Sequence, residues 1–361
     1  MRIEELDYHL PPERIATHPA DPRDHSRLLV YRRADGAVRH HRFFELPELL
    51  AAGDLLVVND TKVVPAKLLL RKPTGAFIPG LFVEELALGR WKLMLRSRGK
   101  LAVGDTLLPA DPQVTDLRVT LQARASGEKG QWIADVTPAL AAPRLLERIG
   151  HVPLPPYIEK ARRDRGGAEE EPADRAAYQT VYADPLHPGS VAAPTAGLHF
   201  TPAVLARLAE RGIARAQVTL HVGLGTFLPV ETDTLEAHPM HTESYVTPAT
   251  TAAALRAQRA AGRRIVVVGT TACRTLEAAA SRILDVAAPP ADIHGTTDLL
   301  ISPGYPLRLT DALLTNFHLP RSTLLALVAA MTGLDTIRRL YAEAIAREYR
   351  FYSYGDAMLI E

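Results

Sequence analysis

The stretch "DLLVVNDTKVVPAKLLLR" (54–71) joins two different kinds of sequence. Residues 54–60 form an apolar run that ends in Asn59 and Asp60, which is typical of a buried strand followed by a polar turn. The remainder opens a series of short β-like runs with turn signals between them: "KVVPAKLLL", "GLFVEEL", "RWKLMLRS", "LRVTLQARAS" and "QWIADVT". Closely spaced short strands without a helical period predict a small all-β barrel or sandwich over 61–149.

Beyond residue 190 the sequence alternates between strand-like and helix-like segments. The stretch 159–178 is strongly polar and is expected to be a loop. The simplest architecture is an α/β main domain with an inserted all-β barrel domain, in which 1–60 and 150–361 form the α/β domain and 61–149 the barrel. We expect strands at 216–222 and 264–271, a strand and turn at 298–305, and helices at 202–212, 247–262, 272–284, 320–333 and 334–348.

The composition is that of an ordinary globular protein with a sizeable core: 361 residues, 47% hydrophobic and 23% charged. The lone Cys273 excludes an internal disulfide framework and fits a reducing compartment. The amino-terminal residues "MRIEELDYHLPPER" are charged throughout, unlike a signal peptide. The apolar run 323–331 is too short to span a bilayer. We therefore expect a cytoplasmic protein that does not bind a membrane.

Charge is balanced overall but uneven along the chain. Lys and Arg total 42 and Asp and Glu total 41, so there is no general attraction to nucleic acid. From Lys62 to Lys100, however, nine basic residues stand against two acidic ones. Such a local excess can form a positive face for RNA on the barrel, or simply a solvated strand surface.

The uncharged stretch "SVAAPTAGLHFT" (190–201) leads small residues into His199. Thr201 is a strong N-cap and Pro202 suits the first position of a helix, so a helix is expected to begin at 202. The small residues before it then form a tight loop that brings His199 to the helix amino terminus. The alternative is a structural loop with a core histidine.

Two further stretches place polar residues at predicted strand ends. "HVGLGTF" (221–227) contains a G-x-G, but it lacks a third glycine and Pro229 follows, so we reject a nicotinamide-binding loop. Its glycines still permit close approach to a ligand, and His221 lies where active-site residues of α/β sheets are found. Thr270 and Thr271 lie between a strand and a helix, where backbone N–H groups can bind a carboxylate; ordinary capping is the alternative.

Other catalytic or metal-binding signatures are weak. His238 and His241 lack cysteine or acidic partners at ligand spacing, so no metal site is predicted. The chain has no P-loop, C-x-x-C or G-x-S-x-G motif.

Taken together, ordered blocks of this sequence resemble one family, the S-adenosylmethionine:tRNA ribosyltransferase-isomerases of queuosine biosynthesis. The resemblance extends from about residue 5 to 360, and the family has an α/β domain interrupted by a β-barrel. The blocks are "LLVVNDTKVVPAKLL", "IGHVPLPPYI", "YQTVYA", "GSVAAPTAGLHFTP", "VTLHVGLGTFLPV", "VVVGTTACRTLE", "ALLTNFHLPRSTLLALV" and "YRFYSYGDAMLI".

The resemblance implies that S-adenosylmethionine is a consumed substrate and a ribosyl donor. Its ribosyl carbons are transferred to the aminomethyl group of a 7-deazaguanine at the tRNA wobble position and isomerised, giving epoxyqueuosine with release of adenine and methionine. The family needs no metal or redox cofactor. The expected partners are S-adenosylmethionine and tRNA with the deazaguanine wobble base, and we expect the protein to be a monomer.

The resemblance also suggests site residues. A base near neutral pKa must remove the proton beside the sulfonium, and histidine is the usual choice. We expect S-adenosylmethionine in a cleft between the two domains, with its carboxylate at Thr270–Thr271 or Ser322–Thr323. The catalytic candidates, in order, are His199, His221, His318 and the non-histidine alternative Glu243. The substrate-binding candidates are Asn59, Thr61, Thr195, Gly197, Gly223, Gly225, Thr226, Thr270, Thr271, Arg274, Asn316, Ser322 and Thr323. The tRNA-binding candidates are Lys62, Lys67, Arg71, Arg96, Arg98 and Lys100.

The sequence departs from the family pattern in places. Phe77 and Pro79 stand where a lysine and a glutamate are common, and Ala272 and Cys273 interrupt a Thr-Ser-Val-Arg run that otherwise keeps Arg274. These departures leave open an alternative function, a non-catalytic or substrate-diverged RNA-binding homologue.

Overall fold

The computed structural model describes residues 1–125, 130–223, 230, 232–289 and 291–361, which divide into two compact units. The larger unit comprises Met1–Lys62, Pro155–Glu171 and Ala176–Glu361. The smaller comprises Val63–Leu154 and Pro172–Arg175, so 150–154 and 172–175 pack with the barrel and not with the α/β domain.

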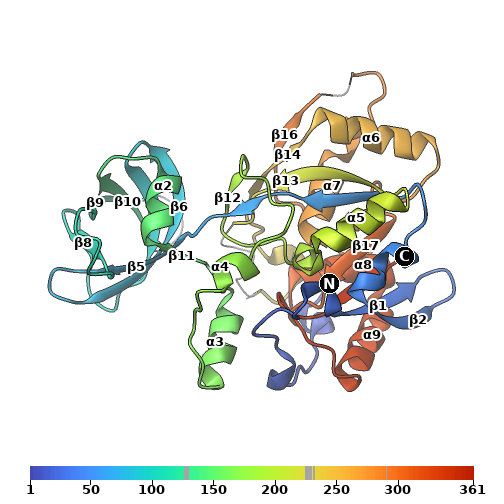
Figure 1. The fold of residues 1–361 in the computed structure, drawn as a ribbon, viewed down its shortest axis with the longest axis horizontal. Helices are drawn as coiled ribbons and strands as arrows, with labels where there is room; N and C mark the ends of the chain where they lie inside the picture. The colour runs from blue at the N-terminus through green and yellow to red at the C-terminus, as the bar shows by residue number, and fades with distance from the viewer. Residues whose placement is uncertain (126–129, 224–229, 231, 290) are drawn as a thin grey trace. The chain divides into compact units, whose positions relative to one another are not determined.

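A nine-stranded mixed sheet forms the centre of the larger unit, in the order β16-β14-β13-β3-β15-β17-β18-β1-β2 (Figure 1). Strands β13, β3, β15 and β17 run parallel to one another, so their carboxyl ends lie at the same edge of the sheet. The strand bounds are β1 Arg27–Arg32, β2 Ala37–Arg42, β3 Leu55–Asn59, β13 Ala214–Leu220, β14 Glu243–Thr247, β15 Ile265–Val268, β16 Ile293–Thr297, β17 Ala312–Asn316 and β18 Ala357–Ile360.

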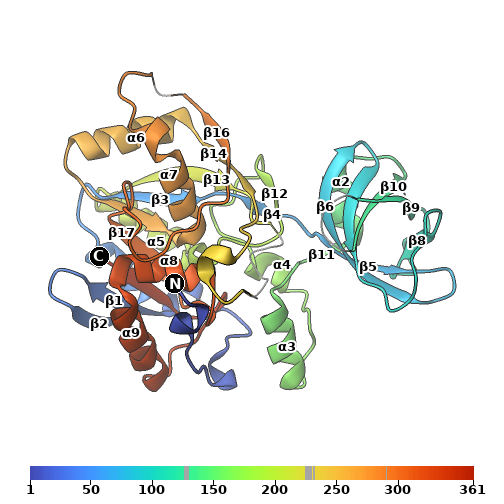
Figure 2. The same ribbon diagram turned by 180° about the vertical axis from the view of Figure 1, so that it is seen from behind.

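The central strands are buried on both faces because each alternates its side chains between two cores. Leu55 and Val57 of β3 belong to the core that includes α6, α7, α8 and α9, whereas Leu56 and Val58 pack with α5 on the other face. α7 packs against β3, β13, β15 and β17, and α8 packs against α9 (Figure 2). The helix bounds are α1 Leu46–Leu49, α3 Pro156–Asp164, α4 Asp174–Ala177, α5 Pro202–Glu210, α6 Ala249–Ala260, α7 Gly269–Ile283, α8 Thr323–Thr332 and α9 Leu334–Ala346.

The smaller unit contains the predicted barrel. Its strands pair antiparallel in the order β5-β6-β7-β10-β9-β8, and β8 pairs back onto β5 to close the barrel, with Trp91 and Trp132 buried. The α/β domain with an all-β barrel is therefore confirmed. The bounds are β5 Lys67–Arg71, β6 Phe77–Ala87, β7 Arg90–Leu95, β8 Thr106–Pro109, β9 Arg118–Arg124, β10 Gln131–Thr137, α2 Ala142–Ile149 and β11 Gly150–His151; the short strands β4 (Lys62–Val63) and β12 (Pro188–Ser190) lie outside the barrel.

Three local predictions were wrong. The segment 298–305, expected as a strand and turn, has the turn at 303–304 but no strand: β16 ends at Thr297, whose hydroxyl accepts a hydrogen bond from the backbone N–H of Leu299. The polar stretch 159–178 is partly helical, since α3 buries Arg162, which donates to the carbonyl of Thr17. α7 begins at Gly269, so Thr270 and Thr271 lie in its first turn.

Among the described residues, no helix combines the length and apolarity needed to cross a membrane.

Candidate functional site

A pocket of the larger unit, called the first pocket below, opens at the carboxyl ends of the parallel strands. The segments after β15 (Gly269–Thr271) and β17 (Phe317–Leu319) line it, as does Val222 beyond the end of β13. In open α/β sheets this edge is where ligands bind. The remaining lining residues are Tyr157, Ala192, Ala193, Pro194, Thr195, Ala196, Thr315, Asn316, Leu324, Tyr352 and Ser353.

The small residues of 192–196 form one wall of the first pocket. Thr195 donates from its hydroxyl to Asn316 Oδ1 at 2.9 Å, and Asn316 Nδ2 donates to the carbonyl of Tyr352 at 3.2 Å. Gly269, at φ 85°, would place a Cβ 3.5 Å from that of Ala196, so this wall packs closely on the start of α7. Of the predicted substrate-binding residues, Thr195, Thr270, Thr271 and Asn316 line this pocket.

His199 is buried in the core and is absent from the lining of the first pocket. Its Nδ1 lies 3.0 Å from the carbonyl oxygen of Ala196 and its Nε2 2.9 Å from that of Gly355, while the ring stacks on Phe43. Burial lowers the pKa of His199. Both ring nitrogens face carbonyl oxygens, so the single acceptor nitrogen of the neutral ring is not directed at a substrate, and the geometry favours the structural alternative for this histidine.

His221 is half-buried just after β13, next to Val222 of the first pocket. Its Nδ1 lies 2.8 Å from Thr61 Oγ1. Burial, followed by the positive charge of His187, lowers the pKa of His221, whereas Asp60 raises it. In the tautomer in which Nδ1–H donates to Thr61, Nε2 carries the lone pair that a general base needs. Thr61 thus orients a histidine instead of lining the pocket.

Asn59 is fully buried and has a positioning role. Its Oδ1 accepts from the backbone N–H groups of Thr61 (3.2 Å) and Leu220 (3.1 Å). Its Nδ2 donates to the carbonyl of Leu220 (3.0 Å) and to Thr271 Oγ1 (3.2 Å). One side chain therefore joins the ends of β3 and β13 to the first turn of α7.

His318 lines the first pocket but is a weak base. Its Nε2 lies 2.8 Å from Thr315 Oγ1, and burial lowers its pKa to about 3. A base whose conjugate acid has so low a pKa has little driving force to take a proton near neutral pH.

A second pocket of the larger unit contains a buried ion pair between Glu243 and Arg274. Glu243 Oε1 also accepts from the backbone N–H of Gly223 at 3.2 Å. Thr323 lines this second pocket, and Leu324 lines both pockets. Ser322 caps α8, since its hydroxyl accepts from the N–H of Leu325 at 3.2 Å.

The predicted glycines differ in their surroundings. A Cβ on Gly197 would lie 2.0 Å from the hydroxyl of Tyr182, so this glycine permits close packing in the core and does not line the pocket. Gly225 and Thr226 lie outside the described residues.

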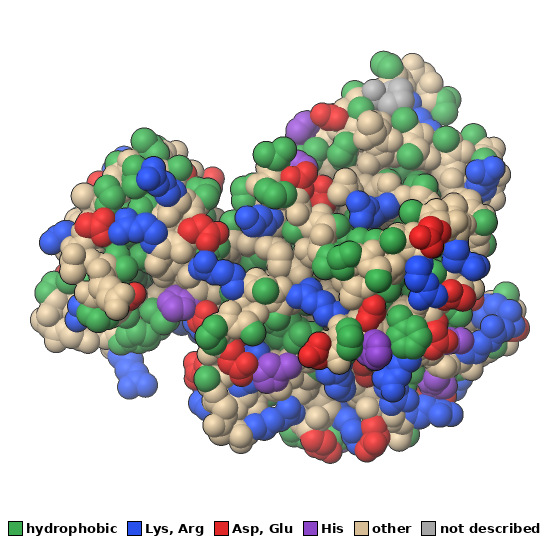
Figure 3. Space-filling view, viewed as in Figure 1, with side chains coloured by type: hydrophobic (Ala, Val, Ile, Leu, Met, Phe, Trp, Pro, Cys, Tyr) green, Lys and Arg blue, Asp and Glu red, His purple; other side chains and the backbone are tan. Residues whose placement is uncertain are grey.

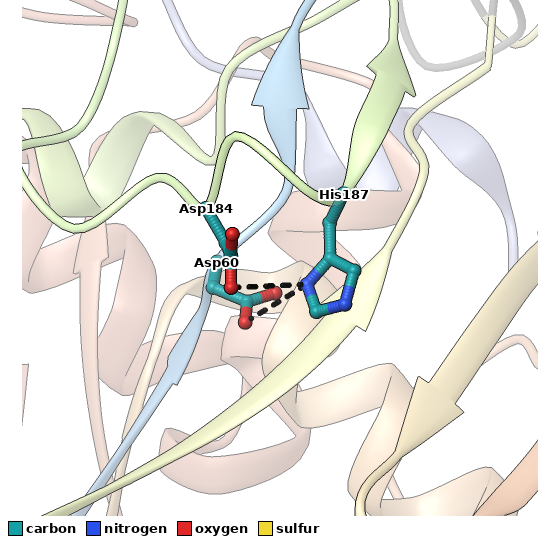
Figure 4. A group of neighbouring side chains, drawn as sticks. All are labelled: Asp60, Asp184 and His187. Atoms are coloured by element: carbon teal, nitrogen blue, oxygen red, sulfur yellow. Dashed lines mark hydrogen bonds and ion pairs between the residues drawn. The ribbon is translucent and has the colours of Figure 1, made fainter.

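An acidic group with a histidine, unforeseen in the sequence, lies near His221. Asp60 Oδ2 and Asp184 Oδ2 lie 3.3 and 3.9 Å from the same ring nitrogen, Nδ1 of His187 (Figure 4). The hydroxyl of Thr219 donates to Asp60 Oδ1 at 2.6 Å. The three groups could also hold a metal ion, but Asp60 is buried and its oxygens already have Thr219 and His187 as partners. The group acts on His221 through its charges, since His187 lowers the pKa of His221 and Asp60 raises it.

The basic residues predicted to bind tRNA differ in exposure. Arg96, Arg98 and Lys100 are exposed, and within the described part of the chain none has a carboxylate partner. Lys62, Lys67 and Arg71 are half-buried. In Figure 3, basic side chains are scattered among acidic and hydrophobic ones, in keeping with the balanced composition.

Comparison with known proteins identifies the family. A family model described as "Queuosine biosynthesis protein" matches residues 3–360. The chain belongs to this family. A relative from Anaeromyxobacter sp. (strain Fw109-5), named S-adenosylmethionine:tRNA ribosyltransferase-isomerase, is 49% identical over 366 residues, which cover 100% of this chain and 99% of the relative. One of the same name from Thermotoga maritima is 47% identical, with full coverage of both chains.

A solved structure is also similar to this member of the queuosine biosynthesis family. It is the S-adenosylmethionine tRNA ribosyltransferase of Thermotoga maritima, 38% identical, with a TM-score of 0.55, covering 99% of this chain and 100% of that one. The family-like blocks of the sequence thus include the strand ends that line the first pocket.

Sequence reasoning missed four polar residues of the first pocket: Tyr157, Thr315, Tyr352 and Ser353. The Tyr157 hydroxyl lies 2.5 Å from Ser353 Oγ, and Tyr352 has φ 71°, a rare value for an aromatic residue. The block "YRFYSYGDAMLI" pointed to this part of the chain, but only the fold brings it to the end of β17.

Proposed function

We propose that the protein transfers the ribosyl moiety of S-adenosylmethionine to tRNA and isomerises it, producing epoxyqueuosine at the wobble position with release of adenine and methionine. The observation that carries this function is full-length identity of 46–49% to relatives named for this activity. The pocket at the carboxyl ends of the parallel strands provides a place for the reaction. No observation favours a non-catalytic homologue over the enzyme.

In this function S-adenosylmethionine is consumed as a substrate, and we propose no metal or redox cofactor. The sulfonium acidifies the C–H beside it by stabilising the carbanion that forms when the proton is removed. A protein base must accept that proton, and the carbon can then form the new ring. The first pocket would hold the nucleoside part of the substrate between 192–196 and the start of α7.

We assign the base to His221. Thr61 holds its Nδ1, and the half-buried ring follows the end of β13, one residue before Val222 of the first pocket, although His221 is not itself among the residues that line that pocket. Burial lowers its pKa, which favours the neutral ring that a base requires. His199 is bonded to carbonyls on both sides, and His318 is too weakly basic. Glu243 is held by Arg274 and by the backbone of Gly223.

The assignment is tested by solvent deuterium exchange into the carbon beside sulfur and by adenine release. His221→Ala should slow both by about 10²–10⁴-fold, the usual range for loss of a general base. His318→Ala and Glu243→Gln serve as comparisons. If His221→Ala exchanges at the parent rate while Glu243→Gln does not, Glu243 is the base.

We further propose that the protein acts as a monomer and that the exposed basic residues of the barrel contact the anticodon arm of the tRNA. Phosphates are bound by Lys and Arg, and these contacts supply affinity without reading sequence. Arg96, Arg98 and Lys100 meet the requirement of exposure without a competing carboxylate among the described residues.

The activity itself is tested by mass spectrometry of nucleosides. Incubation with S-adenosylmethionine and tRNA bearing the aminomethyl deazaguanine should give epoxyqueuosine, adenine and methionine. A parallel reaction with tRNA bearing guanine at the wobble position should give none. Binding of the modified tRNA without any new nucleoside would overturn the proposal in favour of an RNA-binding homologue.

A further inference from the structure

We propose that the second pocket binds the amino-acid end of S-adenosylmethionine, with Arg274 as the anchor of its carboxylate and Glu243 as the partner of its ammonium group. This inference rests on the proposed function for the identity of the ligand. The location itself follows from the chemistry of the pocket wall.

The second pocket combines apolar side chains with one buried pair of opposite charges, and His238, His241 and Thr323 also line it. Met240, Leu300 and Leu327 contribute apolar side chains, and Glu243 and Arg274 are 5% and 7% exposed. The amino-acid part of S-adenosylmethionine has the matching parts, because its CH₂ groups between the sulfonium and the α-carbon are apolar and its end carries one positive and one negative charge. Apolar contacts bind the former, and charge-assisted hydrogen bonds bind the latter.

Arg274 has donors left for a carboxylate. A guanidinium carries five N–H groups. Nε donates to the carbonyl of Leu299 at 3.1 Å, Nη1 to Glu243, and Nη2 to the carbonyl of Thr297 at a long 3.5 Å. Among the described residues these three bonds leave one N–H on each terminal nitrogen, and a carboxylate can accept a hydrogen bond from a free guanidinium N–H.

The ion pair is not explained by stability alone. Desolvating two charges costs about as much as their attraction returns, so a buried pair by itself contributes little to folding. Here the pair lies in a pocket wall, where both charges can contact a zwitterionic ligand. The arrangement therefore fits a binding site better than a purely structural link between α7 and β14.

The second pocket adjoins the first, which fits a ligand with two chemically different ends. Leu324 lines both pockets, so they adjoin at the start of α8. A nucleoside in the first pocket then leaves the sulfonium near Leu324 and the amino-acid end in the second.

The two helix amino termini considered from the sequence are weaker anchors. The hydroxyl of Thr271 accepts from Asn59, and that of Ser322 caps α8. Neither carries a full positive charge, whereas Arg274 does. Thr323, at the start of α8, lines the second pocket and can contact the same carboxylate.

The test uses the full chain and the parent's own products as probes. In the adenine-release assay, L-methionine should inhibit, whereas 3-(methylthio)propylamine, which lacks the carboxylate, should inhibit at least tenfold more weakly. Arg274→Lys keeps the positive charge but removes the two terminal guanidinium nitrogens that donate hydrogen bonds. It should raise KM for S-adenosylmethionine by about ten- to a hundredfold, the range for losing hydrogen bonds to a charged group, and abolish inhibition by methionine while leaving that by adenine unchanged.

Arg282→Lys is the matched control, since Arg282 is exposed on the same helix and donates to the carbonyl of His294 at 2.9 Å. Equal inhibition of the parent by methionine and by the amine overturns the inference without any variant, as does unchanged methionine inhibition in Arg274→Lys. A parent that turns over no tRNA would instead refute the proposed function, and calorimetry with L-methionine then still tests the pocket.

Discussion

Burial of His318 should make the larger unit lose stability as the pH falls. The fold lowers the pKa of this histidine from 6.5 to about 3, because the charged ring would be desolvated. Below pH 6.5 the unfolded chain binds a proton that the folded chain does not, so the unfolding free energy decreases with falling pH. The slope is about 1.4 kcal/mol per pH unit, and the loss amounts to about 3 kcal/mol at about pH 4.5.

The substitution to make is His318→Gln, which removes the titratable ring and keeps a polar side chain that can hydrogen-bond to the hydroxyl of Thr315. The buried His199 also has a lowered pKa and adds to the parent's slope, so the difference between parent and variant isolates His318. Urea unfolding followed by far-ultraviolet circular dichroism should show a shallower pH dependence in the variant. His9→Gln, at an exposed position, controls for the loss of one histidine.

The two tryptophans provide an internal reference. Trp91 and Trp132 both belong to the barrel, so tryptophan fluorescence follows the smaller unit. That transition should have the same pH dependence in parent and variant. A variant whose circular dichroism transition keeps the parent's full slope would refute the buried neutral state of His318.

Three further outcomes are expected. His187→Gln should raise the pKa of His221, because it removes a neighbouring group whose positive charge lowers that pKa. The acid limb of the pH profile of adenine release should then move to higher pH. An acid limb at the parent's pH would contradict the assignment of that limb to His221. The Cys273 thiol, whose pKa burial raises to about 12, should resist iodoacetamide until the protein unfolds, and labelling of the native chain would contradict this. Three single substitutions remove exposed cations of the barrel: Arg96→Ala, Arg98→Ala and Lys100→Ala. Each should lower the slope of log affinity for tRNA against log salt concentration by about one, and an unchanged slope in all three variants would place the tRNA-binding surface elsewhere.

The fold was largely predictable because its periodic signals are local. The run 54–60 became β3, the alternating runs became barrel strands, and Thr201–Pro202 began α5 as expected. The failures came where tertiary partners decide. The apolar run in "DLLISPGY" is typical of a strand, but strand β16 ends at Thr297. The carbonyl of Leu299 accepts a hydrogen bond from Arg274 and not from a neighbouring strand.

The site was predictable in its neighbourhood but not in its roles. The position between a strand and a helix pointed to Thr271, and the family-like blocks pointed to Thr195 and Asn316; all three line the first pocket. The sequence ranked His199 first for a plausible reason, its small-residue loop. Its two carbonyl partners come from 196 and 355, and the second lies 156 residues away along the chain, which no local pattern reveals.

The position of Asn59 explains how a site assembled from separate segments of the chain is held in one geometry. Its four hydrogen bonds hold Thr61 after β3, Leu220 at the end of β13 and Thr271 in the first turn of α7, three segments at one edge of the sheet. Thr61 in turn orients His221, and Thr271 lines the first pocket. The proposed base and the pocket wall are therefore positioned by one buried amide at the end of β3, a strand that is rigid because it is packed on both faces. Removing that amide would leave buried backbone groups of Leu220 without partners, and the histidine would lose its orientation before the fold was lost.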